Sequence, residues 1–271
     1  MADQVITERT TISSPRTMQV LRGVLWGLDH WILILSVGIG VLVIGPFLAP
    51  VFMHLGWIVP AQVIYGIYST LCHQMAQRSY FLFGSQPMYN MAQLPLPLTG
   101  KMVSDILLLR GFIGNENLGW KVAWSDRMVY MYGGVWIVGT VYGLVRKHRR
   151  IHTLNLFTFG LLLLPMLVDG LTHMLSDISG GLAGGFRYNN QWLAQLTTNR
   201  LPTWFYVGDA FGSFNSWMRL ISGITFAVGI VWFVYPYLNA ALVESAEKLR
   251  ADFSEVRPTL GGNPSVADWS H

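Results

Sequence analysis

Of the 271 residues in this chain, 52% are hydrophobic and only 12% are charged, about half the charged fraction of an ordinary soluble domain. The net charge of +4 is modest. This composition excludes an ordinary soluble domain and is typical of an integral membrane protein.

Four long, mainly apolar stretches of the chain contain no Asp, Glu, Lys or Arg. An apolar stretch of about 18 residues is long enough to cross the hydrocarbon core of a bilayer as a helix, and the first stretch, with 48 residues, could cross twice. We therefore predict an all-α fold, a polytopic membrane helix bundle with about five transmembrane helices and two long outer loops. The charge-free stretches are 30–77, 128–145, 151–168 and 220–243.

A polar N-terminal tail, residues 1–28, precedes a predicted membrane domain over 29–240. The first span is expected at 30–52, where Pro46 and Pro50 should bend or end the helix because proline lacks an amide hydrogen. Pro60 suits the first turn of a second span, 58–75, which is the least hydrophobic and is either buried among the others or does not cross fully.

Residues 77–124 should leave the bilayer, with an interfacial helix in their short apolar piece, 102–113. Two further spans are expected at 127–145 and 151–174. A second long loop over 176–215 is rich in glycine and aromatic residues and leads into the last span, 217–240. The polar C-terminal tail, 241–271, should begin with a surface helix and end without order.

Basic residues gather in the predicted turn at 146–150, which reads Arg-Lys-His-Arg-Arg. Such a cluster beside a span marks the cytoplasmic side, and we prefer this interpretation to nucleic-acid binding. The C-terminus then lies inside, and loops 77–124 and 176–215 lie outside. Five spans would put the N-terminus outside, whereas Arg9, Arg16 and Arg22 favour the inside, so its side stays open.

This orientation brings the ionisable residues at the span ends to one face of the membrane. Burying such groups near hydrocarbon is costly, so they usually pair with one another or line a cavity. We therefore predict a polar cluster at the outer face. Its candidate members are Cys72, His73, Arg78, Asp126, Arg127, Asp169, His173 and Arg219.

Two chemical roles are open to this cluster. Asp169 and His173 are four residues apart, so they share one helix face and could bind a divalent metal together with His73, or act as a base and its orienting partner. Alternatively, the two residues satisfy each other as an ion pair. The arginines could hold a phosphate or carboxylate headgroup, or could pair with Asp126 and Asp169.

Several motifs resemble an uncharacterised prokaryotic membrane family, domain of unknown function 2085. The resemblance extends over spans two to five and implies a shared architecture and polar cluster without an established activity. Where the family carries a Cys-x-Arg-Cys stretch, this chain has Ser125-Asp126-Arg127-Met128, so any metal or redox site of those cysteines is lost or rebuilt. The motifs are Leu71-Cys72-His73-Gln74, Arg78-Ser79-Tyr80-Phe81, Gly84, Pro165-Met166, Asp169-Gly170-Leu171-Thr172-His173, Arg219, Ser222-Gly223 and Gly229.

Two functions therefore remain, and the sequence leaves open whether the protein is an enzyme. The favoured hypothesis is a non-catalytic component of the cell membrane or subunit of a complex, in contact with the lipid bilayer and with a membrane-protein partner through loops 77–124 and 176–215. The alternative is a metal-dependent enzyme acting on a lipid-like substrate at the outer face. No cofactor other than a divalent metal is indicated.

Overall fold

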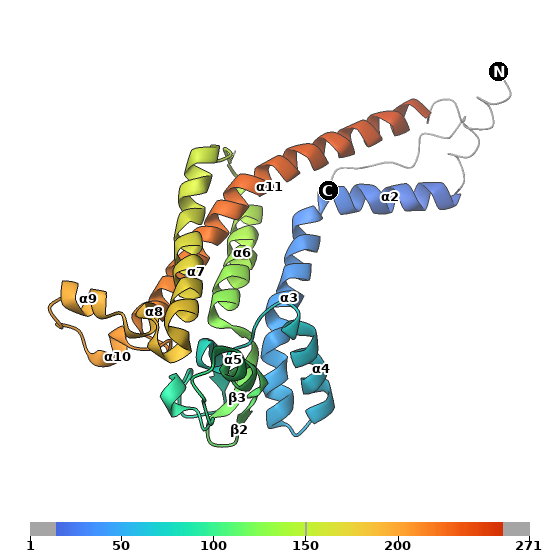
Figure 1. The fold of residues 1–271 in the computed structure, drawn as a ribbon. Helices are drawn as coiled ribbons and strands as arrows, with labels where there is room; N and C mark the ends of the chain where they lie inside the picture. Colours follow the sequence, from blue (N-terminus) through green and yellow to red (C-terminus); the bar gives the residue numbers. More distant parts are fainter. Residues whose placement is uncertain (1–14, 150, 257–271) are drawn as a thin grey trace.

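A computed structural model describes residues 15–149 and 151–256, so the predicted end of the C-terminal tail, Arg9 and Arg150 lie outside the described residues. The fold is mainly α-helical (Figure 1). Within the described residues, four helices, rather than the five predicted, are long and apolar enough to cross a membrane. They are α3 (Trp31–His54), α6 (Asp126–Val145), α7 (Leu156–Gly184) and α11 (Phe214–Val256).

The predicted second span is shorter in the structure, because α4 (Ile58–Ser69) has only 12 residues, which agrees with the expectation that it is buried among the others or does not cross fully. At 1.5 Å per residue, such a helix is about 18 Å long and cannot cross a bilayer of about 30 Å. The helix folds back along α3 instead, and the Tyr68 hydroxyl donates to the Leu42 carbonyl of α3 at 3.0 Å. The Tyr65 hydroxyl donates to the Lys121 carbonyl outside the helices. One face of α4 therefore packs on protein, whereas Val59, Val63 and Ile67 on it are 55–72% exposed.

Two other spans are longer than predicted. Helix α7 begins at Leu156, where the Asn155 side chain accepts the Thr158 amide at 2.7 Å, and it continues past residue 174 to Gly184. Helix α11 runs over 43 residues, so the surface helix predicted after residue 240 is continuous with the last span. Helix α2 (Pro15–Asp29) precedes α3 and projects sideways from the end of the bundle, beside the second half of α11 (Figure 1).

The first long loop contains a small sheet that was not predicted. Its strands are β1 (Ser79–Leu82), β2 (Gly114–Asn115) and β3 (Gly119–Ser125), in the antiparallel order β1-β3-β2, and α5 (Met102–Gly111) matches the predicted interfacial helix to within two residues. Gly119 has a φ of +78°, and a Cβ there would lie 2.2 Å from the Leu82 carbonyl oxygen. Strand β3 continues directly into α6, so the sheet fixes the beginning of that helix.

Small residues allow α6 and α11 to pack closely, as is usual between membrane helices. A Cβ built on Gly134 would lie 2.8 Å from the Ala227 Cβ, and one on Gly223 would lie 2.7 Å from the Tyr130 Cβ. The core beside this contact contains Trp31, Tyr142, Tyr235 and other apolar residues. The bundle is therefore held by close backbone approach together with aromatic packing.

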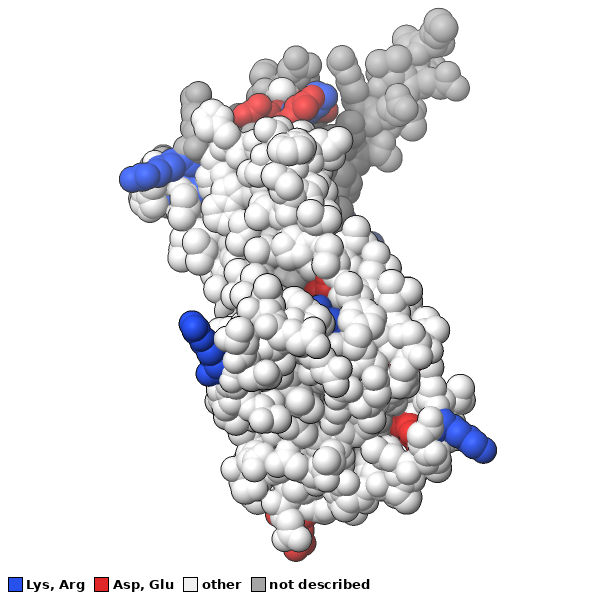
Figure 2. All heavy atoms as spheres, turned by 60° about the vertical axis from the view of Figure 1, so that its left-hand side comes forward, with Lys and Arg blue, Asp and Glu red and all other residues white. Residues whose placement is uncertain are grey.

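The two ends of the bundle differ (Figure 1). Helix α2, the turn after α6 and the second half of α11 lie at one end. The sheet, α4, α5 and the short helices α8 (Phe186–Asn189), α9 (Gln191–Leu196) and α10 (Thr203–Tyr206) lie at the other, and we call residues 76–125 and 185–213 at this end the cap. Figure 2 shows a surface nearly free of charge between one charged end and a small patch of adjacent acidic and basic atoms about halfway along.

Candidate functional site: a buried arginine–aspartate network

The polar side chains gather where the cap meets the helices. Asp126 and Arg127 open α6, directly after β3, and Arg219 lies in the second turn of α11. Helix α7 contributes Asp169, His173 and Asp177, which repeat every four residues and therefore share one face. The cap contributes Arg78 before β1, Arg187 in α8, and Asp209 in the connection from α10 to α11.

One line of ion pairs joins the cap to three helices. Asp177 accepts the two terminal nitrogens of Arg78 at 3.0 and 3.1 Å, and the Arg78 Nε donates to Asp209 at 2.9 Å. Asp209 accepts Arg219 Nη1 at 2.8 Å through its other oxygen, and the Arg219 Nε donates to Asp126 at 2.7 Å. Arg219, Asp126 and Asp209 are at most 2% exposed, so this line is buried.

A second line is centred on Asp169. One of its oxygens accepts Arg127 Nη2 at 2.6 Å, and the other accepts Arg187 Nη2 at 2.7 Å. The same Arg187 nitrogen lies 3.2 Å from His173 Nε2, to which it donates, so the imidazole proton resides on Nδ1. Three buried nitrogens here have no partner among the described residues: Arg127 Nε, His173 Nδ1 and Arg187 Nε.

The network contains four arginines and four aspartates, so its formal charge is zero without counting His173. Burial would raise the pKa of Asp209, but the charges of Arg78 and Arg219 outweigh it and lower that pKa. Burial alone would lower the pKa of Arg78, but the negative charges of Asp209 and Asp177 outweigh this effect and raise that pKa. Burial lowers the pKa of Arg187, against the attraction of Asp169. Mutual compensation therefore keeps these groups ionised.

Two of the predicted site residues lie outside the network. His73 is exposed, and the part of the chain that the structure describes shows no hydrogen bond or ion pair from its side chain to the cluster. Cys72 lies 3.4 Å from the Ser125 hydroxyl, next to Asp126, and also accepts the Gln74 amide. The other six candidates are members of the network: Arg78, Asp126, Arg127, Asp169, His173 and Arg219.

The predicted metal ligands are not assembled. No group of three or more His, Cys, Asp and Glu side chains suited to a metal ion occurs within residues 15–149 and 151–256. The physical reason is that Arg187 donates to His173 Nε2, and arginines engage both oxygens of Asp169. Since His73 is exposed, a metal would have to displace two arginines to bind Asp169 and His173.

Sequence reasoning missed three members of the network. Asp177 could have been found, because it follows Asp169 and His173 at the same four-residue interval. Asp209 is the sole acidic residue between 178 and 243, which is unusual enough to indicate a paired role. Arg187 gave no comparable signal, because nothing in the loop sequence shows that its backbone amide docks on the Ser176 hydroxyl of α7.

Buried amides hold the second part of the cap in place. The Asn215 side chain donates to the carbonyls of Arg187 and Gly208 at 2.7 and 2.9 Å, and Asn190 donates to the Tyr206 carbonyl at 2.7 Å. Gly208 has a φ of +89°, and a Cβ there would lie 2.2 Å from the Asn90 side-chain oxygen, so only glycine fits. These contacts position Arg187 and Asp209 for their ion pairs.

Comparison with known proteins gives a relationship without a function. The chain is similar to an uncharacterised protein of Methanocaldococcus jannaschii, with 28% identity over 134 residues. This match covers 48% of the chain and 64% of that protein. No family model matches the chain, and no solved structure matches it.

Proposed function

We propose that this protein is a non-catalytic, multi-pass membrane component in which the arginine–aspartate network clamps the cap onto four transmembrane helices. Support comes from the four long apolar helices and from the charge-poor surface between the network and the opposite end (Figure 2). The network then lies at the boundary of the bilayer, where ionisable groups are tolerated when they are paired.

We infer the orientation of this arrangement from the basic turn. Arg146, Lys147 and Arg149 at the end of α6 should face the cytoplasm, which puts the cap outside the cell membrane. With four spans, α2 and the end of α11 lie on the cytoplasmic side as well. Arg16 and Arg22 in α2 then agree with the charge rule, which removes the conflict that a count of five spans created.

A structural role is supported by one observation: every carboxylate oxygen in the network accepts a hydrogen bond. Asp126 uses one oxygen for the Arg127 amide at 2.7 Å and the other for Arg219, and both oxygens of Asp169, Asp177 and Asp209 accept from arginines. Cationic donors that stay bound to a carboxylate lower its basicity and hold it in place, whereas a general base or a nucleophile must be free to react. A network compensated in this way favours clamping over catalysis.

The cap also presents an apolar surface suited to a partner or to the bilayer surface. Large hydrophobic side chains from the second part of the cap are 42–75% exposed. Clusters of such residues on a folded domain usually mark an interaction site. We therefore infer that the protein is a subunit of a membrane complex that docks through this surface. The residues are Phe186, Trp192, Leu196, Leu201, Trp204 and Phe211.

We also propose membership of the family with domain of unknown function 2085. Of the motif residues that carry the resemblance, Arg78, Asp169, His173 and Arg219 are all in the network. The clamp is therefore expected to be a property of the family's architecture. This chain lacks the family's cysteines at the start of α6, which is compatible with a site that needs no metal.

One observation favours the enzymatic alternative. The buried N–H groups of Arg127, Arg187 and His173 that have no acceptor among the described residues all surround Asp169. Such donors could hold an anionic group of a lipid-like substrate at the outer face. This candidate requires a reacting group, and the carboxylates of the network are already engaged by arginines, so we place it second.

Two measurements on protein extracted from native membranes in mild detergent test the proposal. We expect no stoichiometric metal, and a complex larger than the monomer whose size falls for Leu196→Ser with Trp204→Ser. A matched control is Val103→Ser with Leu107→Ser, which alters two exposed apolar residues of α5 and should leave the complex intact. A monomeric protein with one metal ion per chain, lost in His173→Ala, would instead establish the enzymatic alternative.

A further inference from the structure

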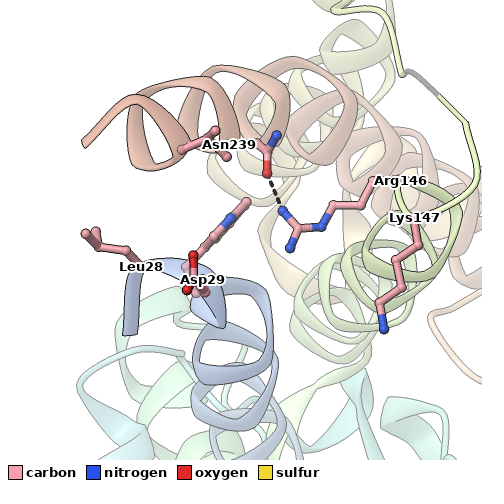
Figure 3. Close-up of a pocket in the computed structure, with 7 residues that line it drawn as sticks. Leu28, Asp29, Arg146, Lys147 and Asn239 are labelled. Carbon is pink, nitrogen blue, oxygen red and sulfur yellow. Dashed lines mark hydrogen bonds between the residues drawn. The ribbon is translucent and has the colours of Figure 1, made fainter. Parts of the chain in front are cut away.

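Two adjoining hollows lie at the end of the bundle opposite the network. They share Arg146, Lys147 and Asn239, and Figure 3 shows the Arg146 guanidinium directed at Asn239 with Lys147 alongside. Their volumes are about 330 and 560 Å³, which is the size of many small-ligand sites. The first is also lined by Leu28, Asp29, Trp31 and Val243, and the second by Tyr142, His148, Arg149, Ile151, His152 and Pro236.

The polar groups around these hollows are mainly donors without carboxylate partners. Among the described residues, no Asp or Glu forms an ion pair with Arg146, Lys147 or Arg149. The Arg146 guanidinium lies 5.8 Å from the centre of the Trp31 ring. Trp31 is 8% exposed, and its indole N–H is buried without an acceptor in the described part of the chain. A ligand rich in acceptors and negative charge would satisfy these groups.

The one carboxylate in the described lining does not oppose such a ligand strongly. Both oxygens of Asp29 accept Arg250 Nη2 at 2.6 Å, so a cation from α11 already compensates this charge. Asp29 and Arg250 connect α2 to the end of α11. The net charge facing the hollows therefore comes from Arg146, Lys147 and Arg149.

The walls of the second hollow are fixed by the sequence of α11. Pro236 has no amide hydrogen, so it cannot donate to the Trp232 carbonyl as the helix pattern requires. The Leu154 amide donates to that carbonyl instead, at 3.4 Å, which ties the segment before α7 to α11. Ile151 packs against the buried core that contains Tyr142. The basic turn is thereby held over a preformed recess.

We propose that these hollows bind the phosphate-bearing headgroup of an anionic phospholipid in the inner leaflet. This inference rests on the proposed function, because only a membrane-spanning bundle brings this end to the headgroup level. Basic recesses at the cytoplasmic ends of membrane helices are suited to such headgroups. Helix α2 projects sideways from the same end with exposed Val20, Val24 and Trp26, as an interfacial helix would (Figure 1). Leu28 and Val243 give the first hollow an apolar wall, which favours a lipid over free phosphate.

The test uses the full-length protein in detergent micelles, titrated with phosphatidylglycerol against phosphatidylcholine. We expect tighter binding of phosphatidylglycerol, weakened about tenfold in Lys147→Gln with Arg149→Gln, because each cation near a membrane surface contributes severalfold in affinity. Both side chains are exposed, so this variant should fold normally. Arg146→Lys, which keeps the charge, should retain most of the binding. The matched control is Lys101→Gln with Arg200→Gln, which removes two exposed cations from the cap.

Three outcomes separate the ideas. Equal binding by the basic-turn variant and the cap variant would overturn the headgroup site while leaving the proposed function intact. Equal competition by glycerol phosphate or inorganic phosphate would overturn the lipid and leave a soluble anion as the ligand. Release of the protein from membranes by alkaline carbonate without detergent would instead overturn the proposed membrane function itself.

Discussion

Arg219 is the residue whose loss should test the clamp most directly. It is 1% exposed and donates to Asp126, to the Asp209 carboxylate and to the Asp209 carbonyl at 2.7–2.8 Å. Replacing it with methionine keeps an unbranched apolar chain in the same space but removes the positive charge. Asp126, which is fully buried, would keep only the Arg127 amide as a donor.

The structure allows the magnitude to be ranked against a second variant. Removing one partner of a buried ion pair typically costs about 3–5 kcal/mol, because the remaining charge is uncompensated, and we expect Arg219→Met to fall in this range. Arg78→Met should cost about 1–3 kcal/mol. The side chains of Arg78 and Asp177 are 14% and 13% exposed, so water can reach Asp177, and Asp209 keeps Arg219.

Reversible unfolding with SDS in mixed micelles, followed by tryptophan fluorescence, measures these free energies. The double variant Arg219→Met with Asp126→Asn restores a neutral network, so it should be more stable than Arg219→Met alone. Together with the single variant Asp126→Asn, the cycle gives the coupling energy of the pair. The reasoning is refuted if Arg219→Met costs no more than Arg78→Met and the double variant shows no recovery.

Three further predictions concern other parts of the chain. Burial lowers the pKa of Lys121 to about 7, below its unfolded value of 10.5, so the unfolded chain binds more protons between these values and stability should rise with pH. The free energy of unfolding, measured by SDS titration, should rise by roughly 2–3 kcal/mol from pH 7 to 9 in the wild type and should not rise in Lys121→Met. An equal rise in the wild type and in Lys121→Met would contradict this prediction. By the same assay, His173→Ala should lower the free energy of unfolding by about 1–3 kcal/mol, whereas His73→Ala should hardly change it, because His73 is exposed. Equal losses of stability in the two variants would contradict this prediction. In a Cys72→Ser background, an impermeant thiol reagent added outside should label cysteines at the cap end of the bundle but not those at the opposite end, and labelling at position 20 would restore the five-span topology. The positions at the cap end are Glu116 in the cap and Gly184 at the end of α7, and the opposite ones are Val20, His148 and Lys248.

The helices could be predicted from sequence where hydrophobic length alone decides the structure. The charge-free run from Met128 to Val145 marks α6 to within two residues, and the first span was placed equally well. The predicted second span is longer than α4, because a run of apolar residues does not show where the helix within it ends. Tyr65 and Tyr68, whose hydroxyls bond to backbone carbonyls, were the evidence for protein contact within that run.

The sheet and the ion pairs could not be predicted from the sequence, for a different reason. Their formation depends on contacts between distant residues, such as Arg78 with Asp209, which are 131 positions apart. Periodicity can show that Asp169, His173 and Asp177 share a face, but it cannot say which arginine faces them. Strand β3 contains the alternating aromatic residues Trp120 and Trp124, yet its partner strand and the glycines that shape the turns are set by tertiary packing.

The neutrality of the network has a consequence for how the cap assembles. The line through Asp126, Asp177 and Asp209 has one more aspartate than arginine, and the line through Asp169 has one more arginine than aspartate. The two lines therefore carry opposite net charges and stabilise each other. Arg78 and Arg187, from the two separate cap segments, belong to different lines. The network residues on the helices sum to −1, and docking of the segment with Arg78 brings the sum to zero. Docking of the segment with Arg187 and Asp209 alone would leave a net charge near the bilayer boundary, which is costly. The segment with Arg78 should therefore dock first, and a change that removes Arg78 should loosen both segments.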